Sequence, residues 1–71
     1  MIPKETTINQ KTLREWRAFR RLTRKEVAKR LDVHPSTYAR MENHPGDVSV
    51  LEANLLAEIF DCGVTEINFF D

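Results

Sequence analysis

The stretch LTRKEVAKRLDVHPSTYARMEN, residues 22–43, decides the fold, because it contains two short helical patterns separated by a turn. Thr23 and Glu26 have the spacing of a capping box, in which each side chain accepts a hydrogen bond from the other residue's backbone amide. A helix is therefore expected to begin at Thr23 and to continue to Leu31. It should end at Asp32, since aspartate tolerates the left-handed conformation that closes many helices.

The second helix of this stretch begins with an unusual pair, His34-Pro35. Steric contact with proline pushes the preceding residue towards extended dihedrals, which an N-cap position also requires. Proline at the first helical position gives up an amide that has no partner within the helix. The pair thus predicts a rigid start to a helix over residues 35–43. Residues 32–34 form the short turn that joins the two helices of a helix-turn-helix.

Two further capping boxes lie outside this stretch. The motif TLRE at residues 12–15 predicts a helix to about Arg21, and SVLE at residues 49–52 predicts one to about Phe60. A last short helix is expected over residues 64–69. Because no window alternates in the manner of a strand, the sequence predicts an all-α fold of five short helices.

We expect one domain at residues 12–71, with a helix-turn-helix at about residues 23–43 and an N-terminal arm at residues 1–11. Apolar side chains recur at helical spacing, which marks the buried face of each helix. From the first three helices the expected core residues are Leu13, Trp16, Val27, Ala28, Leu31, Tyr38 and Met41.

The fourth predicted helix carries two apolar stripes, whereas one stripe is enough to bury a helix against a core. The first stripe consists of Val50, Ala53, Leu56, Ala57 and Phe60. The second stripe consists of Leu51, Leu55 and Ile59. Either this helix is central and buried all round, which we favour, or the second stripe contacts a partner. Phe69 and Phe70 indicate an interface more strongly, although they would also fit against the core.

Basic and acidic residues are segregated along the chain, although their eleven positive and eleven negative charges cancel. Residues 11–40 hold ten basic and three acidic residues, a net charge of +7. Residues 41–71 hold seven acidic residues and no Lys or Arg, a net charge of −7. Because placement decides an electrostatic footprint, the basic segment fits a nucleic-acid partner. Ordinary solvated helix faces are the alternative interpretation.

Other classes of protein find little support in the sequence. The single cysteine, Cys62, permits no internal disulfide and suits a reducing compartment such as the cytoplasm. With His34 and His44 it shows no zinc-site spacing, so neither a metal nor another cofactor is expected. We expect no enzyme and no small-molecule ligand, since no catalytic constellation or Gly-rich phosphate loop is present. No apolar run reaches membrane-spanning or signal-peptide length.

A set of characteristic residues and short motifs is spread over residues 12–70. In the central stretch they are Leu22-Thr23, Glu26-Val27-Ala28, Leu31, Val33, Ser36-Thr37 and Met41-Glu42-Asn43. Outside it they are Leu13, Trp16, Arg17, Leu56-Ala57, Phe60, Cys62 and Val64-Thr-Glu-Ile67. With these residues and motifs the chain resembles the Cro/repressor type of helix-turn-helix, the XRE family of phage and bacterial regulators. The resemblance implies a lambda-repressor-like domain whose recognition helix enters the DNA major groove.

The resemblance also implies roles for individual residues. The implied base contacts are Ser36, Thr37, Arg40 and, by its position, Pro35. The implied phosphate contacts are Thr23, Arg24, Lys25, Asn43 and His34. Arg40 is able to hold a guanine through two hydrogen bonds, whereas Pro35 stands where relatives often have a polar base reader. His34 would contact phosphate only when protonated, and the positive helix end disfavours that charge.

Arg17 and Glu42 match two residues that form a largely buried ion pair in several members of the family. The alternatives are a phosphate contact for Arg17 and an exposed acid at Glu42. We favour the ion pair, because an unpaired Glu42 next to DNA would repel it. Two departures from the family pattern are Asp32, where glycine is usual, and Pro35, whose lack of a polar group leaves the operator sequence open.

The leading hypothesis is a sequence-specific transcriptional regulator, a Cro-like repressor that binds double-stranded operator DNA as a homodimer. The dimer interface candidates are Leu51, Leu55, Ile59, Phe69 and Phe70. The controllers of restriction-modification systems are similar in size and stay open as an alternative. A second hypothesis is a protein-interaction module on the same scaffold, such as an antitoxin or an anti-repressor, because the C-terminal half is acidic and carries a surplus apolar stripe.

Overall fold

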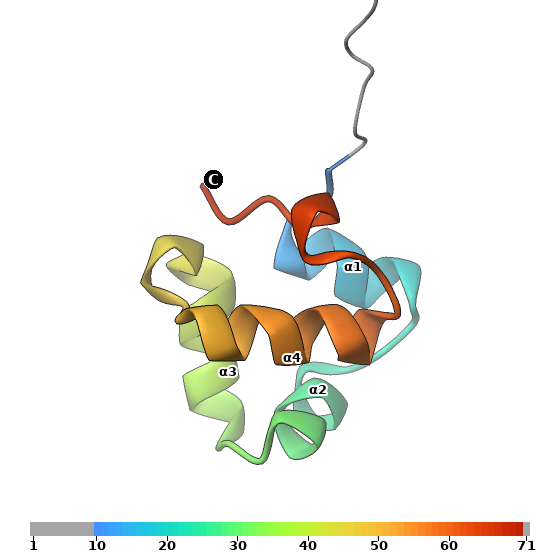
Figure 1. The fold of residues 1–71 in the computed structure, drawn as a ribbon. Coiled ribbons are helices and arrows are strands. Elements are labelled where there is room, and N and C mark those ends of the chain that lie inside the picture. The colour runs from blue at the N-terminus through green and yellow to red at the C-terminus, as the bar shows by residue number, and fades with distance from the viewer. Residues whose placement is uncertain (1–9, 71) are drawn as a thin grey trace, which may run out of the picture.

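The computed structural model describes residues 10–70, and residues 1–9 of the predicted N-terminal arm lie outside this part of the chain. Its elements are α1 (Leu13–Phe19), α2 (Arg24–Leu31), α3 (Pro35–Asn43), the 3-10 helix η1 (Pro45–Asp47), α4 (Val50–Phe60) and the 3-10 helix η2 (Val64–Glu66). The helices enclose a common centre (Figure 1), and residues 10–70 contain no strand apart from one isolated bridge. The prediction of an all-α fold is confirmed.

The three predicted capping boxes begin α1, α2 and α4. At the start of α2, the Thr23 amide donates to Glu26 Oε1 over 2.7 Å, and the Glu26 amide donates to Thr23 Oγ1 over 3.0 Å. The same reciprocal bonds form at the start of α1 and of α4. These bonds satisfy first-turn amides that would otherwise have no partner within the helix.

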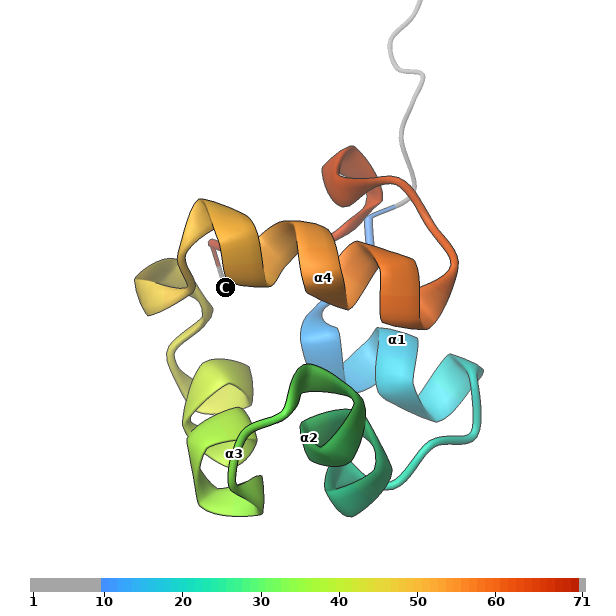
Figure 2. The same ribbon diagram turned by 60° about the horizontal axis from the view of Figure 1, so that its bottom comes forward.

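The turn between α2 and α3 has the predicted geometry at both of its ends. Asp32 closes α2 in the left-handed conformation, with φ of 62° and ψ of 43°. His34 is extended, with φ of −69° and ψ of 146°, and Pro35 is the first residue of α3. Figure 2 shows α2 and α3 next to each other at one end of the molecule, and these two helices contact each other extensively.

Two predicted helices are shorter than expected. The first ends at Phe19 rather than at Arg21, because Arg21 itself takes the left-handed conformation with φ of 58°. The predicted fifth helix is the single turn η2, which makes four the number of α-helices in the described chain. Beyond this turn the Asn68 amide donates to the Lys11 carbonyl over 2.8 Å, so the backbone after η2 follows the start of the domain instead of continuing a helix.

All seven core residues predicted from the first three helices are buried. The remaining buried apolar residues of the described chain are Leu56, Ala57, Phe60 and Ile67. Leu56 and Phe60 have no exposed surface, so α4 is attached to the rest of the domain by one face.

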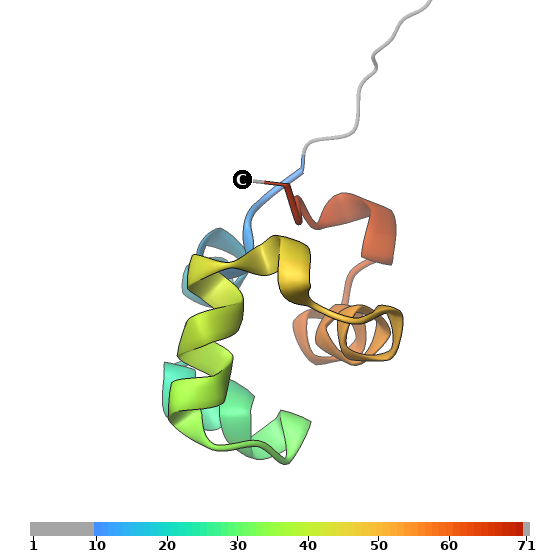
Figure 3. The ribbon, with the colours of Figure 1, turned by 90° about the vertical axis from the view of Figure 1, so that its left-hand side faces the viewer.

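The prediction that the fourth helix is buried all round is wrong. Val50, which we expected to face the core, is 79% exposed, and Leu51 and Leu55 are 70% and 37% exposed. Figure 3 shows α4 end-on, with α3 and η2 on some of its sides and no described element on the side turned away from α3. A domain of this size has too few elements to surround α4, so the second apolar stripe stays largely uncovered.

Candidate DNA-binding surface

The two faces of α3 have different environments. Tyr38 and Met41 are buried and fasten the helix to the core. Of the four residues to which the resemblance assigns base contacts, three are exposed and Thr37 is half-buried. The three exposed residues are Pro35, Ser36 and Arg40. The outer side of α3 therefore offers one guanidinium and two hydroxyl groups to a ligand, together with the apolar ring of Pro35.

His34 is the N-cap of α3, as the sequence predicted, and its side chain makes a capping bond that the sequence did not predict. Its Nδ1 atom accepts a hydrogen bond from the Ser36 amide over 3.1 Å and lies 2.8 Å from Ser36 Oγ. Because Nδ1 acts as an acceptor here, this nitrogen carries no proton. Only the other ring nitrogen stays available for the phosphate contact that the resemblance implies.

The start of α2 adds positive charge beside α3. Arg24 and Lys25 are exposed on its first turn, and Lys29 and Arg30 are exposed on its second. The Thr23 hydroxyl accepts the Glu26 amide in the capping box, so as an acceptor it already has a partner within the protein.

Glu42, near the end of α3, lies at the centre of an ion-pair cluster that joins α1, α2 and α3. Its carboxylate has no exposed surface. Arg17 Nε lies 2.6 Å from Oε2, Arg24 Nε lies 3.0 Å from Oε1, and Arg14 Nε lies 4.0 Å from Oε1. The structure thus brings Arg17 and Glu42 together, and it adds two arginines to them.

The electrostatics of this cluster keep the carboxylate ionised. Burial by itself raises the pKa of Glu42, but the hydrogen bonds from Arg17 and Arg24 outweigh it and hold the pKa below its ordinary value. The hydrogen bond to Glu42 in turn raises the pKa of Arg17. Burial also raises the pKa of Tyr38, and the nearby Glu42 charge raises it further. The Tyr38 hydroxyl makes no hydrogen bond of standard geometry within the described chain.

Arg14 and Asn43 lie at the edge of this cluster. With Thr12 and Glu42 they line a shallow hollow of about 280 Å³ between the start of α1 and the end of α3. No role for Arg14 was predicted from the sequence. Its spacing of three residues from Arg17, which places the two on one face of a helix, was the available signal.

Some of the positive charge of residues 11–40 serves the fold. Arg20 donates from Nε to the Phe60 carbonyl over 2.7 Å and from Nη2 to the Asp61 carbonyl over 3.2 Å, and so closes the end of α4. Its guanidinium also lies 5.0 Å from the centre of the Phe19 ring, and Lys11 Nζ lies 4.7 Å from the same ring. Arg14 and Arg21 are exposed as well, and with the exposed cations of α2 and α3 they make up the rest of the basic segment that faces outward.

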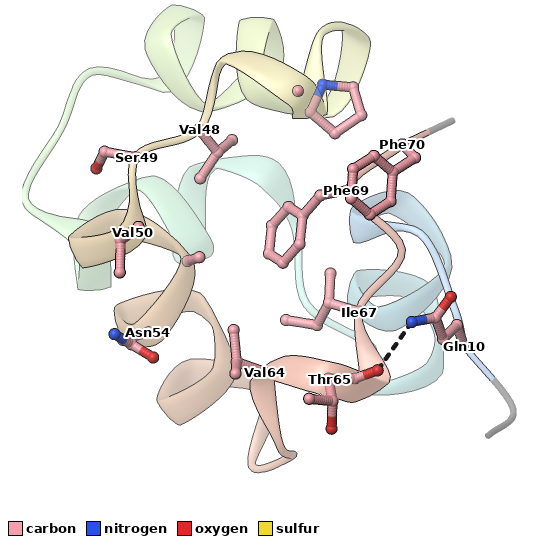
Figure 4. Close-up of a pocket in the computed structure, with 13 residues that line it drawn as sticks. Gln10, Val48, Ser49, Val50, Asn54, Val64, Thr65, Ile67, Phe69 and Phe70 are labelled. Carbon is pink, nitrogen blue, oxygen red and sulfur yellow. Dashed lines mark hydrogen bonds between the residues drawn. The ribbon is translucent and has the colours of Figure 1, made fainter.

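A second surface feature is an apolar groove of about 640 Å³ formed by the start of α4, η1, η2 and the C-terminal segment (Figure 4). Val48, Ile67 and Phe69 are among its lining residues, and the Gln10 side chain bonds the Thr65 carbonyl at its edge over 2.9 Å. Phe70 also lines the groove and is 93% exposed.

The five dimer interface candidates do not form one continuous site. Phe69 and Phe70 line the groove, whereas Leu51, Leu55 and Ile59 do not. Ile59 and Phe69 are partly buried against the core. Leu51 is the most exposed of the three stripe residues on α4, so it is the one most open to a partner.

Residues 10–70 contain neither a membrane-spanning helix nor a cluster of potential metal ligands. No helix in this range is long and apolar enough to cross a bilayer. No group of three or more potential metal ligands occurs in the same range.

A family model described as helix-turn-helix matches residues 13–67, from the first residue of α1 to the bridge after η2. The comparisons with curated proteins and with solved structures gave no match.

Proposed function

We propose that this chain, which belongs to the helix-turn-helix family of Cro/XRE-type transcription regulators, binds a specific double-stranded operator and represses transcription as Cro proteins do. The observation that carries the proposal is the arrangement of α3, with one face buried in the core and the opposite face polar and exposed. A helix held in this way is able to enter the major groove, which admits an α-helix and presents a distinct pattern for each base pair.

In this proposal the exposed side of α3 reads the operator. Ser36, Thr37 and Arg40 contact base edges through hydrogen bonds, with Arg40 placed to hold a guanine. Pro35 has no donor, so it contacts a base only through its apolar ring. Operator preference at the position beneath Pro35 is therefore set by shape and apolar contact instead of hydrogen bonding.

The groups around α3 hold the DNA backbone in the same proposal. The proposed phosphate contacts are Thr23, Arg24, Lys25, His34 and Asn43. Contacts of this kind fix the register of the protein on the duplex but carry no direct sequence information. Residues 12–71 then act as the DNA-binding domain, with the helix-turn-helix at about residues 23–43 and residues 1–11 as an arm.

In vitro selection from a random duplex library tests the proposal, because it yields the length and symmetry of the bound site together. We expect one enriched site, and Arg40→Ala should weaken its binding by about 1–3 kcal/mol and relax preference at one base pair. The matched control is Arg30→Ala, which removes an exposed charge at the end of α2 and should leave base preference unchanged. A library without any enriched sequence would contradict the proposal.

We further propose that the operator is bound by a homodimer. The apolar groove and the exposed leucines of α4 support this, since a monomer of this size gains little from leaving such surface in water. A single module also makes a small interface with DNA, and two modules on half-sites one helical turn apart double it.

Sedimentation equilibrium of matched variants tests the dimer. Leu51→Asp should shift the protein towards monomer, because it puts a charge on an exposed apolar side chain of α4. Ala18→Asp adds the same charge at an exposed site on α1 and should leave the association unchanged. A wild-type protein that stays monomeric at all concentrations and selects a non-palindromic site would contradict this part of the proposal.

The uncovered apolar stripe of α4 supports a second candidate function, a protein-interaction module such as an antitoxin or an anti-repressor. The acidic half of the chain, with no Lys or Arg in residues 41–71, would fit a basic partner. In that case Arg40→Ala would leave the function intact, while Leu55→Asp would abolish it. Loss of function in Arg40→Ala, with function kept in Leu55→Asp, would favour the DNA-binding regulator.

A further inference from the structure

The ion-pair cluster at Glu42 carries more positive charge than its single carboxylate neutralises. Three guanidinium groups, those of Arg14, Arg17 and Arg24, lie within 4.0 Å of it. Once the carboxylate has neutralised one guanidinium, two positive charges of the cluster are left without a counter-charge in it. A cluster built only to stabilise the fold would need one or two arginines, because the first already makes a hydrogen bond of 2.6 Å.

The three arginines differ in what their terminal nitrogens do. Arg17 is 19% exposed, and its Nη1 donates to the Leu22 carbonyl over 3.2 Å. Arg14 and Arg24 are 62% and 48% exposed, and both approach Glu42 through Nε. Within residues 10–70 their terminal nitrogens donate to no acceptor. Within the described chain each of the two therefore leaves its terminal N–H donors open to solvent. Arg24 Nε is hydrogen-bonded to the carboxylate, whereas Arg14 Nε, at 4.0 Å, interacts with it through charge alone.

The hollow described above lies beside these donors. Its lining residues are Thr12, Arg14, Glu42 and Asn43. The lining thus includes a guanidinium and an amide, and the second guanidinium, that of Arg24, lies outside the lining but contacts the same carboxylate oxygen. Planar guanidinium groups with two free N–H donors match the oxygens of a phosphate group.

We propose that this hollow receives one phosphodiester group of the DNA backbone, which Arg14 and Arg24 bind and Asn43 supports. Glu42 is the positioning residue: it fixes the two guanidinium groups before DNA arrives, so that less side-chain freedom is lost on binding. The inference rests on the proposed DNA-binding function. It adds Arg14 to the binding residues and gives Glu42 a role in affinity besides its role in the fold.

The first test measures the salt dependence of binding to a duplex of mixed sequence, of about 20 base pairs, because phosphate contacts need no particular sequence. Fluorescence anisotropy between about 50 and about 200 mM salt gives the slope of log affinity against log salt. Because a single phosphate is bound, the Arg14→Gln/Arg24→Gln double variant should reduce that slope by about 0.9, and each single variant should reduce it by part of that amount. Arg30→Gln, the matched control, should leave the slope at its wild-type value.

A wild-type slope in the Arg14→Gln/Arg24→Gln double variant would overturn the inference, while binding by the wild-type protein would leave the proposed function standing. Failure of the wild-type protein to bind any duplex would instead overturn the proposed function. The two failures are therefore distinguishable in one experiment.

The second test concerns the positioning role of Glu42. Simple charge repulsion predicts that Glu42→Gln binds the same duplex more tightly, because a negative charge near the phosphates is removed. Positioning predicts the opposite, a severalfold weaker affinity. In the Arg14→Gln/Arg24→Gln background the weakening should disappear, since neither of the two guanidinium groups proposed to bind phosphate is left for Glu42 to position.

Circular dichroism and thermal unfolding show whether Glu42→Gln is folded at the assay temperature. If it is not, Glu42→Asp replaces it, because aspartate keeps the charge and withdraws the carboxylate by one methylene. Positioning predicts a severalfold loss of affinity in Glu42→Asp at unchanged net charge. Affinity equal to or above that of the wild-type protein in the folded variant would overturn the positioning role.

Discussion

The arrangement of the helix-turn-helix depends most on the ion pairs around Glu42. A buried carboxylate is tolerated only when its charge is compensated, and removing a partner of a buried pair typically costs about 3–5 kcal/mol. Here Arg17 from α1 and Arg24 from α2 supply the compensation at 2.6 Å and 3.0 Å. The cluster therefore fixes α3 relative to the two preceding helices.

The lowered pKa of Glu42 predicts how stability depends on pH. Because the folded-state pKa lies below the ordinary value of 4.5, ionised Glu42 contributes stability that is fully present above pH 4.5. That contribution is lost as the pH falls through the folded-state value. Urea unfolding at a series of acidic pH values should show a steeper loss of stability in the wild-type protein than in Glu42→Gln.

Other carboxylates, among them Glu26 with its own lowered pKa, are present in both proteins, so the difference between the two pH profiles isolates Glu42. Burial alone would raise the pKa of Glu42, and ionised Glu42 would then destabilise the fold. Parallel profiles for the two proteins would show that the carboxylate gains nothing from its arginines.

At the scale of an element, α3 shows how a short helix is held in place for recognition. A helix of nine residues is not stable alone in water, so its ends and its buried face must supply the stability. His34 and Pro35 define its first turn, and Tyr38 and Met41 attach its inner face to the core. The exposed face is then free to carry side chains chosen for a ligand.

The N-cap at His34 predicts a measurable effect on stability. His34→Ala should lower the free energy of unfolding by about 1 kcal/mol, because the Ser36 amide loses its acceptor. His34→Ser restores a favoured capping residue and should match or exceed the wild-type protein. Chemical denaturation at neutral pH measures both variants, and an alanine variant as stable as the wild-type protein would contradict the capping role.

At the scale of the whole molecule, charge is divided between the two halves of the chain. Seven of the eleven basic residues lie on α1, α2 and α3, and residues 41–71 carry seven acids and no Lys or Arg. In a symmetric dimer the same surface of each protomer meets its copy. A dimer formed through α4 and the C-terminal segment would therefore bring like charges close together.

This division predicts opposite responses to salt. DNA binding should weaken as salt rises, because phosphate contacts release counterions. Dimerisation through the acidic half should strengthen, because salt screens the repulsion between the protomers. Anisotropy on duplex DNA and sedimentation equilibrium without DNA, both measured over the same salt series, check the two directions. Dimerisation that weakens with salt would point to an interface through the basic half.

Features that depend on a few neighbouring residues followed from the sequence. The starts of α1, α2 and α4 were predicted because each capping box places its hydroxyl and carboxylate three residues apart. The left-handed end at Asp32 was predicted for a similarly local reason. The left-handed conformation of Arg21 was not predicted, since an arginine gives no local signal for a φ of 58°.

The sequence by itself determined the order of the helices, the turn between α2 and α3 and most of the core, since periodicity and capping act over one or two helical turns. Only the tertiary structure decided that Arg14 and Arg24 join Arg17 at Glu42, because these side chains come from three helices. The tertiary structure alone also replaced the fifth helix by a turn and left Leu51 uncovered. Both outcomes depend on which elements are available to pack against a given face, and no local pattern records that.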